Sequence, residues 1–377
     1  MANISPDLDA KATQALFRDV IEPLADRFAP ALCDEYVRLF APVIESVYPE
    51  LRAGGLIARY ERVRKVRRAD MEPARVYVLS RVTIGADVAI TSIVLDGARK
   101  RWPTAEIVFV GPGKNYELFA ADPRIGYRAV AYPRVGTLRE RLAVHESLAL
   151  AEPESIVIDP DSRLTQLGLL PVCTEDRYFF FESRAYGGDG TESLVALTKR
   201  WVAEVTGTAD AGAFIAVPPS SRPVDVTVSL GVGENPAKRV ADPFETELLR
   251  LLTAQFARVI VDSGGGGEEA ERARAAVAAS GGRAEVFTGS FAEFAGLIRA
   301  SRLYAGYDSA GGHVAAACGV PAISVFAGFV SERMLQRWRP EGPGPIHLVR
   351  SDGDAIGGVK RALDEMHYCP SVKFRSI

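Results

Sequence analysis

The chain has 377 residues, of which 47% are apolar and 25% charged, the balance of an ordinary soluble globular protein. At roughly 150 residues per domain, this length corresponds to about two or three domains, whose cores need neither disulfides nor a structural metal. The 45 basic and 48 acidic residues give a net charge of −3, which excludes a generally basic nucleic-acid binder.

Cysteine usage and the amino terminus indicate the compartment. The four cysteines form no C-x-x-C pair, and His145, His347 and His367 have no metal-ligand spacing, so we expect neither a disulfide framework nor a metal site. The first residues lack the apolar core of a signal peptide, and no apolar run approaches the ~20 residues of a membrane span. We therefore expect a cytoplasmic protein.

Residues 1–72 predict a helical extension. Apolar residues recur there at helical spacing, and Pro23, Pro30 and Pro42 are expected to break the stretch into short helices. A basic run at 59–68 follows. It is either a solvated helix face or a patch that faces anionic lipid or an anionic substrate.

Residues 73–222 predict an α/β domain, because short β-rich runs alternate with amphipathic segments. This alternation is typical of βαβ units and a mainly parallel sheet. The expected strands are 76–80, 106–110, 155–159 and 177–181, and the expected helices are 87–101, 138–150 and 192–206.

Residues 223–377 predict a second α/β domain, which follows a Pro-rich stretch with the composition of a linker. Helices are expected between its strands, and the last helix, at about 355–366, is expected to cross back toward the first domain. The expected strands are 225–230, 258–262, 283–287, 303–307, 322–326 and 346–349.

One segment of the second domain has the pattern of an anion site. A strand ends at Asp308, and a helix that carries His313 begins just after it. The residues that open this helix are small: Ser309, Ala310, Gly311 and Gly312. Exposed amides and the helix dipole favour an anion such as a diphosphate at such a turn. The alternative is a tight strand-to-helix turn in which Asp308 or Ser309 caps the helix.

A glycine-rich turn after the first strand of this domain is a second candidate. Gly231 and Gly233 begin a dinucleotide fingerprint, but Pro236 stands at the third glycine position and weakens it. Lys238, just beyond the turn, suits a phosphate oxygen, unless it is an ordinary surface lysine. Glu268, after a run of four glycines, is placed to reach a ribose hydroxyl.

The first domain offers a candidate base and candidate acceptor-binding residues. Asp87 stands where a loop becomes a helix at the carboxyl edge of the sheet, where open α/β folds place their ligands. A carboxylate there suits a general base toward a hydroxyl, and the alternative is an N-cap or first-turn aspartate of the helix. Charged residues at the same edge suit an acceptor's carboxylate or phosphate, unless they pair with one another. They are Arg81, Arg163, Glu182 and Arg184.

These segments, in this order, resemble glycosyltransferase family 9, whose best-known members are the ADP-heptose:lipopolysaccharide heptosyltransferases. The family's G-D-x-x-x-T-x-P-like turn reads G-A-D-V-A-I-T-S at 85–92, and its R-x-x-x-P-x-A-x-I stretch reads R-K-R-W-P-T-A-E-I at 99–107. Its D-[ST]-G-x-x-H-x-A-A motif reads D-S-A-G-G-H-V-A-A at 308–316. Ala86 and Ala310 stand where the family has glycine.

The resemblance implies a GT-B architecture of two Rossmann-like domains that face a cleft, with the acceptor in the first and a nucleotide-sugar in the second. It implies inverting transfer without a metal or other cofactor, from an ADP-linked donor, in lipopolysaccharide biosynthesis. It assigns the role of base to Asp87 and contact with the donor diphosphate to Lys238. The residues of the 308–313 turn map to the family's donor motif.

The leading hypothesis is therefore a glycosyltransferase that acts on a saccharide or glycolipid acceptor, in contact with the inner face of the membrane and without a nucleic-acid partner. One alternative is a non-catalytic nucleotide-sugar binding protein of the same fold, because Ala86 and Ala310 replace glycines. The other is an NAD-dependent oxidoreductase, because Gly231 and Gly233 precede a strand that ends at Asp262.

Overall fold

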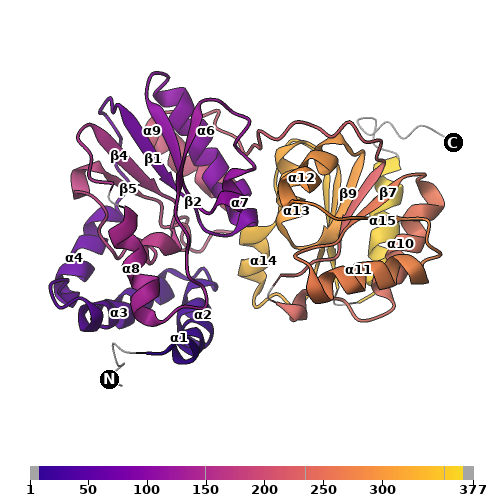
Figure 1. Cartoon of the computed structure of the whole chain (residues 1–377), viewed down its shortest axis with the longest axis horizontal. Coiled ribbons are helices and arrows are strands. Elements are labelled where there is room, and N and C mark those ends of the chain that lie inside the picture. The colour runs from indigo at the N-terminus through magenta and orange to yellow at the C-terminus, as the bar shows by residue number, and fades with distance from the viewer. Residues whose placement is uncertain (1–7, 149, 234, 352, 368–377) are drawn as a thin grey trace. The chain divides into compact units, whose positions relative to one another are not determined.

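A computed structural model describes residues 8–148, 150–233, 235–351 and 353–367 of the chain (Figure 1). The chain forms two compact units, Met1–Ala213 and Phe214–Ile377, each built around one sheet of parallel strands. The predicted fold class, two α/β domains in series, is thereby confirmed.

The sheet of the first unit has five strands in the order β3-β2-β1-β4-β5. They are β1 (Arg75–Leu79), β2 (Glu106–Gly111), β3 (Ile125–Ala129), β4 (Ser155–Asp159) and β5 (Tyr178–Phe180). The sequence did not predict β3. This edge strand is only partly buried and contains a glycine, so it lacks the continuous apolar run of a buried parallel strand.

Two of the helices after the strands cover one face of this sheet, α6 and α9, which pack against each other. Gly97 allows that contact, because a Cβ there would overlap Val202 of α9. The helical elements are α5 (Ile84–Ala86), a π-helical turn (Asp87–Thr91), α6 (Ser92–Arg101), α7 (Gly113–Tyr116), α8 (Leu138–Leu148), 3₁₀ turns at Arg163–Thr165 and Glu175–Arg177, and α9 (Leu194–Thr206).

The helical extension covers most of the other face. The connection from β4 to β5 contains only the two 3₁₀ turns, so α8 is the one helix that the strand connections place on this face. Residues of the extension share a core with sheet residues such as Tyr77, Val157 and Phe180 (Figure 1). The extension is thus one of the two helix layers of the first unit. Its elements are α1 (Ala10–Leu16), a π-helical turn (Phe17–Ile21), α2 (Glu22–Ala25), α3 (Pro30–Val47) and α4 (Ala53–Val63).

The prediction that Pro42 breaks a helix is wrong, because Pro42 lies inside α3. An interior proline costs about 3 kcal/mol. The helix continues through it because its apolar face, which includes Phe40 and Ile44, is completely buried against the rest of the first unit. Pro23 and Pro30 do stand in the first turns of α2 and α3, as proline tolerates.

The basic run at 59–68 ties the extension to the sheet. Arg59 donates a hydrogen bond of 2.7 Å to the carbonyl of Gly168, and Arg62 pairs with Glu175 at 2.7 Å. These contacts lie within the first unit, and a role of the run as a patch that faces anionic lipid or an anionic substrate stays a prediction. Among the described residues, no helix is long and apolar enough to cross a membrane. The arginines that make such contacts are Arg59, Arg62, Arg64 and Arg67.

The second unit has six parallel strands in the order β11-β10-β9-β6-β7-β8, and all six were predicted. The order reverses between β6 and β9, which makes the carboxyl ends of these two strands the expected ligand site. The strands are β6 (Val226–Ser229), β7 (Val259–Asp262), β8 (Glu285–Phe287), β9 (Leu303–Tyr307), β10 (Ala322–Phe326) and β11 (Ile346–Arg350).

The last helix, α15, packs against α10 and β11 of its own unit. Its expected return toward the first unit stays a prediction. The helical elements of the second unit are a 3₁₀ turn (Pro236–Lys238), α10 (Phe244–Gln255), α11 (Gly267–Ala279), α12 (Phe291–Ala300), α13 (Ala310–Ala317), α14 (Glu332–Trp338) and α15 (Ala355–His367).

Candidate functional site

The structure brings Lys238 and Asp308 together at the point where the strand order of the second unit reverses. The Lys238 ammonium lies 2.6 Å from the Asp308 carboxylate and 3.4 Å from the Asp308 carbonyl oxygen. Their side chains are only 21% and 11% exposed. Lys238 is therefore not an ordinary surface lysine but a partly desolvated cation at the predicted anion site.

The first turn of α13 has no side-chain cap. Ser309 is the N-cap residue, yet its hydroxyl makes no capping hydrogen bond and lies 3.1 Å from the hydroxyl of Tyr304. The carboxylate of Asp308 is held by Lys238 instead. Among the described residues no side chain caps the first-turn amides of α13, so the alternative in which Asp308 or Ser309 caps the helix is wrong, and these amides are free to face a ligand.

The glycines of this turn differ in their surroundings. A Cβ at Gly311 would lie 2.5 Å from the Tyr304 hydroxyl oxygen and 2.6 Å from a ring carbon, so glycine is required there. A Cβ at Gly312 would make an ordinary contact, 3.4 Å from Pro340. Ala310, the first residue of α13, is half-buried and carries its methyl group where the resembling family has glycine.

His313 is buried beneath the same turn, 6.0 Å from the ring of Trp338 between centroids. Burial lowers the pKa of His313 to about 4, although the Asp308 carboxylate acts in the opposite direction. Its Nδ1 has no hydrogen-bond partner among the described residues. At neutral pH this imidazole is uncharged and able to bond an oxygen without adding charge.

Backbone amides of the glycine-rich turn and of the four-glycine run already donate hydrogen bonds to one side chain. The backbone N–H groups of Val232, Gly233 and Gly265 each donate 3.1 Å hydrogen bonds to the carboxylate of Glu269. A Cβ at Gly231 would lie 3.3 Å from the same carboxylate. Sequence reasoning missed Glu269, although an acid in the first turn of a helix, here α11, is a known signal for such contacts.

Glu268 lies on the outside of α11. Its side chain is 79% exposed and pairs with Arg239 at 3.1 Å. Its contact with a ribose stays a prediction, as do the direct donor contacts of Gly231 and Gly233.

Asp87 of the first unit is completely buried, and its carboxylate accepts four hydrogen bonds. The donors are the Ser80 hydroxyl (2.6 Å), the Arg81 amide (2.7 Å), the Thr91 hydroxyl (2.6 Å) and the Asn115 side-chain amide (2.5 Å). Burial raises the pKa of Asp87, and these hydrogen bonds oppose that shift. Because protein donors occupy the carboxylate, an acceptor hydroxyl must displace one of them to reach it.

Asp87 is not the N-cap of α5, a position that Thr83 holds, but it is the first residue of the π-helical turn, so the alternative of a first-turn acid fits the structure. Its role as the base stays a prediction. Thr91 follows Asp87 by four residues, a spacing that places both on one helix face, and the motif itself contained this threonine. Asn115 comes from α7, the short helix after β2, and no local pattern indicates it.

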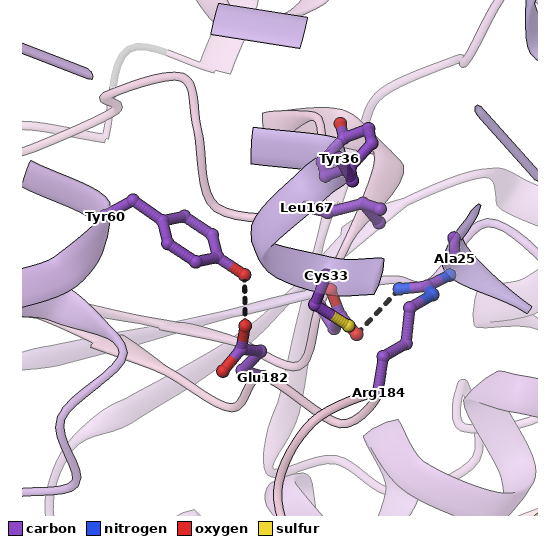
Figure 2. Close-up of a pocket in the computed structure, with 8 residues that line it drawn as sticks. Ala25, Cys33, Tyr36, Tyr60, Leu167, Glu182 and Arg184 are labelled. Atoms are coloured by element: carbon purple, nitrogen blue, oxygen red, sulfur yellow. Dashed lines mark hydrogen bonds and ion pairs between the residues drawn. The ribbon is translucent and has the colours of Figure 1, made fainter. Parts of the chain in front are cut away.

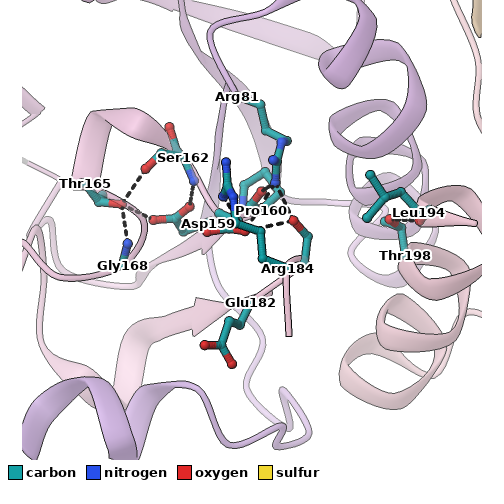
Figure 3. A network of polar contacts seen from close by, with 12 residues as sticks. Arg81, Asp159, Pro160, Ser162, Thr165, Gly168, Glu182, Arg184, Leu194 and Thr198 are labelled. Atoms are coloured by element: carbon teal, nitrogen blue, oxygen red, sulfur yellow. Dashed lines mark hydrogen bonds and ion pairs between the residues drawn. The ribbon is translucent and has the colours of Figure 1, made fainter. Parts of the chain in front are cut away.

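Two of the predicted acceptor-binding arginines, Arg81 and Arg184 (Figure 3), form a buried network with the carboxylate of Asp161. Arg81 donates to the Pro160 carbonyl at 2.6 Å and to the Ser183 hydroxyl at 2.7 Å, and it lies 3.6 Å from the Asp161 carboxylate. Arg184 lies 2.6 Å from the same carboxylate. Burial lowers the pKa of Arg81 to about 10, so it is still charged at pH 7. These are buried ion pairs and not pairs on the surface.

Glu182 and Arg184 line a small cavity that the helical extension closes with Cys33, Tyr36 and Tyr60 (Figure 2). Glu182 accepts a 2.5 Å hydrogen bond from the Tyr60 hydroxyl and a 3.0 Å hydrogen bond from the Arg64 guanidinium. Glu182 is thus joined to α4 and to Arg64, the residue that follows it. Of the four predicted acceptor-binding residues, Arg163 alone is half-buried; the others are buried.

The Glu182 carboxyl makes the stability of the first unit depend on pH. Burial raises its pKa from 4.5 to about 7, so between these values the folded unit retains a proton that the unfolded chain has released. Stability therefore falls as the pH rises through this window. We expect the free energy of unfolding to be lower at pH 8 than at pH 6 by on the order of 1 kcal/mol, and Glu182→Gln to remove this difference. Urea unfolding of the first unit at both pH values measures it.

Burial raises the pKa of Asp159 to about 6, so this second acid is half ionised at pH 6 and contributes less than Glu182 to the difference between pH 6 and pH 8. Glu175→Gln, which removes an exposed partner of Arg62, is the matched control and should retain the wild-type difference. If Glu182→Gln and the wild type lose equal stability between the two pH values, Glu182 is not the titrating group.

The described residues contain no group of three His, Cys, Asp or Glu side chains arranged to hold a metal ion. The site of the second unit is instead composed of Lys238, the Asp308 carboxylate, the open end of α13 and a neutral His313. This chemistry favours an anion with several oxygens, such as a diphosphate.

The two parallel α/β sheets in series place the chain among two-domain proteins with Rossmann-like halves. No protein-family model and no curated protein matches its sequence. Solved structures do match it in fold. The E. coli heptosyltransferase WaaC with ADP superposes with a TM-score of 0.60 at 16% identity, covering 77% of this chain and 99% of that one.

Two further structures agree. A glycosyl transferase of family 9 from Veillonella parvula has a TM-score of 0.56 at 16% identity, covering 78% of this chain and 91% of that one. E. coli ADP-heptose lps heptosyltransferase II has a TM-score of 0.52 at 16% identity, covering 77% of this chain and 98% of that one. The chain therefore has the fold of the family 9 heptosyltransferases, as the sequence resemblance implied.

Proposed function

We propose that the chain is an inverting, metal-independent glycosyltransferase that moves a sugar from a nucleoside-diphosphate sugar, preferably ADP-linked, to a hydroxyl of a saccharide or glycolipid. The observation that carries this proposal is the Lys238–Asp308 pair beside the uncapped first turn of α13. The fold shared with a heptosyltransferase that binds ADP supports the choice of nucleotide.

In this proposal the donor diphosphate binds the amides at the start of α13, and the Lys238 ammonium exchanges Asp308 for a phosphate oxygen. As the bond between the anomeric carbon and the diphosphate breaks, negative charge grows on the leaving oxygen. The α13 amides and Lys238 are already oriented toward that charge and stabilise it. Neutral His313 offers a further hydrogen bond and leaves the net charge of the site unchanged.

On the acceptor side, Asp87 takes the proton of the attacking hydroxyl, whose oxygen forms the new bond to the anomeric carbon on the face opposite the leaving group. This requires Asp87 to be ionised and one of its four hydrogen-bond donors to be displaced by the acceptor hydroxyl. The four donors equally favour the second candidate function, a nucleotide-sugar binding protein without turnover. The two candidates share donor binding and differ in transfer.

Thermal shift with ADP, UDP, GDP, CMP and NAD tests the donor class. We expect ADP to stabilise the second unit, and Lys238→Met to weaken ADP binding by about tenfold or more, the loss of a charge-assisted contact. Lys360→Met, an exposed lysine of α15, is the control and should bind like the wild type.

Stabilisation by none of these nucleotides would overturn the proposal. Stabilisation by NAD alone would also overturn it and would support the oxidoreductase alternative instead. Binding of ADP without sugar transfer from any ADP-sugar to any glycan offered would favour the non-catalytic candidate.

A further inference from the structure

The aromatic ring of Phe17 in the helical extension holds two arginines from other parts of the first unit. Phe17 begins the π-helical turn of the extension and is 2% exposed. The guanidinium carbon of Arg141, in α8, lies 4.4 Å from its ring centroid, and that of Arg163, after β4, lies 5.9 Å from it. Each cation is attracted to the ring, so the extension gathers two like charges at one place.

Neither arginine has an acidic partner among the described residues. The Nε of Arg141 and one terminal nitrogen of Arg163 are buried without any hydrogen-bond partner, although Arg141 is only 5% exposed. A terminal nitrogen of Arg141 does donate to the carbonyl of Arg134. At the same sheet edge, Arg81 and Arg184 share the carboxylate of Asp161.

Leaving buried guanidinium N–H groups unpaired is unfavourable, and the more so because the group is charged. Two uncompensated cations also repel each other in a low-dielectric setting. A water molecule can satisfy an N–H group but cannot balance the charge. The cluster therefore lacks a balancing negative charge among the described residues, and its chemistry favours an anion.

The neighbouring polar groups extend the site. The hydroxyl of Tyr132 is buried without a partner and, like Arg163, lies near enough to Tyr36 to influence its hydroxyl electrostatically. The side-chain oxygen of Gln166 is also unpartnered and can accept from a protonated ligand oxygen. Two guanidiniums and a phenol are donors that suit the oxygens of a phosphate or a carboxylate.

The position of this cluster points to the acceptor. Arg163 follows β4 at the carboxyl edge of the sheet, where ligands of open α/β folds bind, and it is half-buried rather than closed off. We propose that Arg163 and Arg141, held against Phe17 of the helical extension, bind a phosphate or carboxylate group of the acceptor. The binding site itself is independent of the proposed function, and its assignment to the acceptor rests on that function.

Calorimetric titration of the full chain tests the site with inorganic phosphate as the probe, at constant ionic strength set with chloride. We expect saturable binding that Arg163→Gln weakens by about tenfold or more, and that Arg163→Lys restores in part, because lysine retains the charge but not the planar fork. Arg177→Gln is the matched control. Arg177 donates to the Ser155 carbonyl at the opposite edge of the same sheet, and its variant should bind phosphate like the wild type.

A second arm separates the acceptor from a free anion. Glucose 6-phosphate and glucuronate should compete with inorganic phosphate, whereas glucose should not. Competition by inorganic anions alone would overturn the assignment to the acceptor. Absent phosphate binding, or equal loss in Arg163→Gln and Arg177→Gln, would overturn the site itself. ADP affinity, measured on the same samples, reports the second unit, so a failure here is distinguishable from a failure of the proposed function.

Discussion

Gly311→Ala is expected to abolish nucleotide binding by the second unit, whereas Gly312→Ala, one residue further along the same helical turn, is expected to be tolerated. A methyl group at Gly311 would stand 2.5 Å from the Tyr304 hydroxyl oxygen, and Tyr304 is completely buried in β9. Because the Tyr304 ring is buried, the overlap is relieved only if the ring or the start of α13 is displaced. Such overpacking costs about 1–3 kcal/mol, occasionally more.

The effect on binding should exceed the effect on stability, because the displaced atoms are the amides that face the proposed diphosphate. We expect Gly311→Ala to weaken ADP binding by at least about a hundredfold, since binding depends on the positions of these groups to within a fraction of an ångström. Calorimetric titration with ADP, together with urea unfolding of the second unit, measures both effects.

Gly312→Ala is the matched control, because the same methyl group there makes only an ordinary contact at 3.4 Å from Pro340. Replacing a helical glycine by alanine stabilises a helix by about 0.5–1 kcal/mol, so this variant should be as stable as the wild type or slightly more so. Equal loss of ADP binding in the two variants would show that the turn tolerates no change for another reason. Unchanged binding in Gly311→Ala would remove this turn from the nucleotide site.

Buried parallel strands are predictable from sequence here because burial on both faces leaves continuous apolar runs. β4, β9 and β10 occupy the predicted ranges 155–159, 303–307 and 322–326 without a shift at either end. β3 was missed because, as an edge strand, it buries only its first residue completely and leaves the rest half-buried or exposed. Helix starts are weaker signals. The predicted helix at 87–101 is in fact a short helix, a π-helical turn and α6 in succession.

The candidate site residues also differ in how far apart in the sequence their partners lie, and only those with close partners are predictable. The turn from Asp308 to His313 is contiguous, so its small residues and its strand-to-helix position are visible in the sequence. Of the partners of Asp87, Thr91 stands in the motif itself, whereas Asn115 approaches from 28 residues away. Nothing local indicates that Tyr60 and Arg64 of the extension hold Glu182, more than a hundred residues further along the chain.

The role of the extension follows from topology and not from its own sequence. Its amphipathic helices have the pattern of any surface helix, and the resembling family offers no counterpart for them. The missing helix between β4 and β5 leaves an apolar sheet face uncovered, and α3 and α4 bury it. The charges at 59–68 had two open interpretations because a sequence does not show which acids and carbonyls lie opposite them.

Asp87→Asn is expected to abolish sugar transfer, with a loss of about a thousandfold or more, while ADP affinity stays at the wild-type value. Transfer is lost because an amide cannot take the acceptor proton. The variant also loses stability, since the amide NH₂ group turns toward donors that the carboxylate had satisfied. We expect the first unit to lose about 2–4 kcal/mol, in urea unfolding, from unsatisfied buried donors.

This substitution alone does not separate a base from a structural carboxylate, because both roles predict inactive protein. The pH profile of Thr91→Val does. The Thr91 hydroxyl donates 2.6 Å to Asp87 and lowers its pKa, so removing it raises that pKa above the already raised wild-type position. Transfer by a general base requires the ionised carboxylate and falls as the pH drops through this pKa.

If Asp87 is the base, the acid limb of the transfer rate in Thr91→Val therefore moves to higher pH, with transfer at alkaline pH close to the wild-type rate. The neighbouring Ser92→Ala is the control, because the Ser92 hydroxyl donates to the Val88 carbonyl and not to Asp87. Its acid limb should stay in place. An acid limb that is unmoved in Thr91→Val, in folded protein that binds ADP, would identify Asp87 as a carboxylate that positions the loop after β1 and leave the proton of the acceptor to another group.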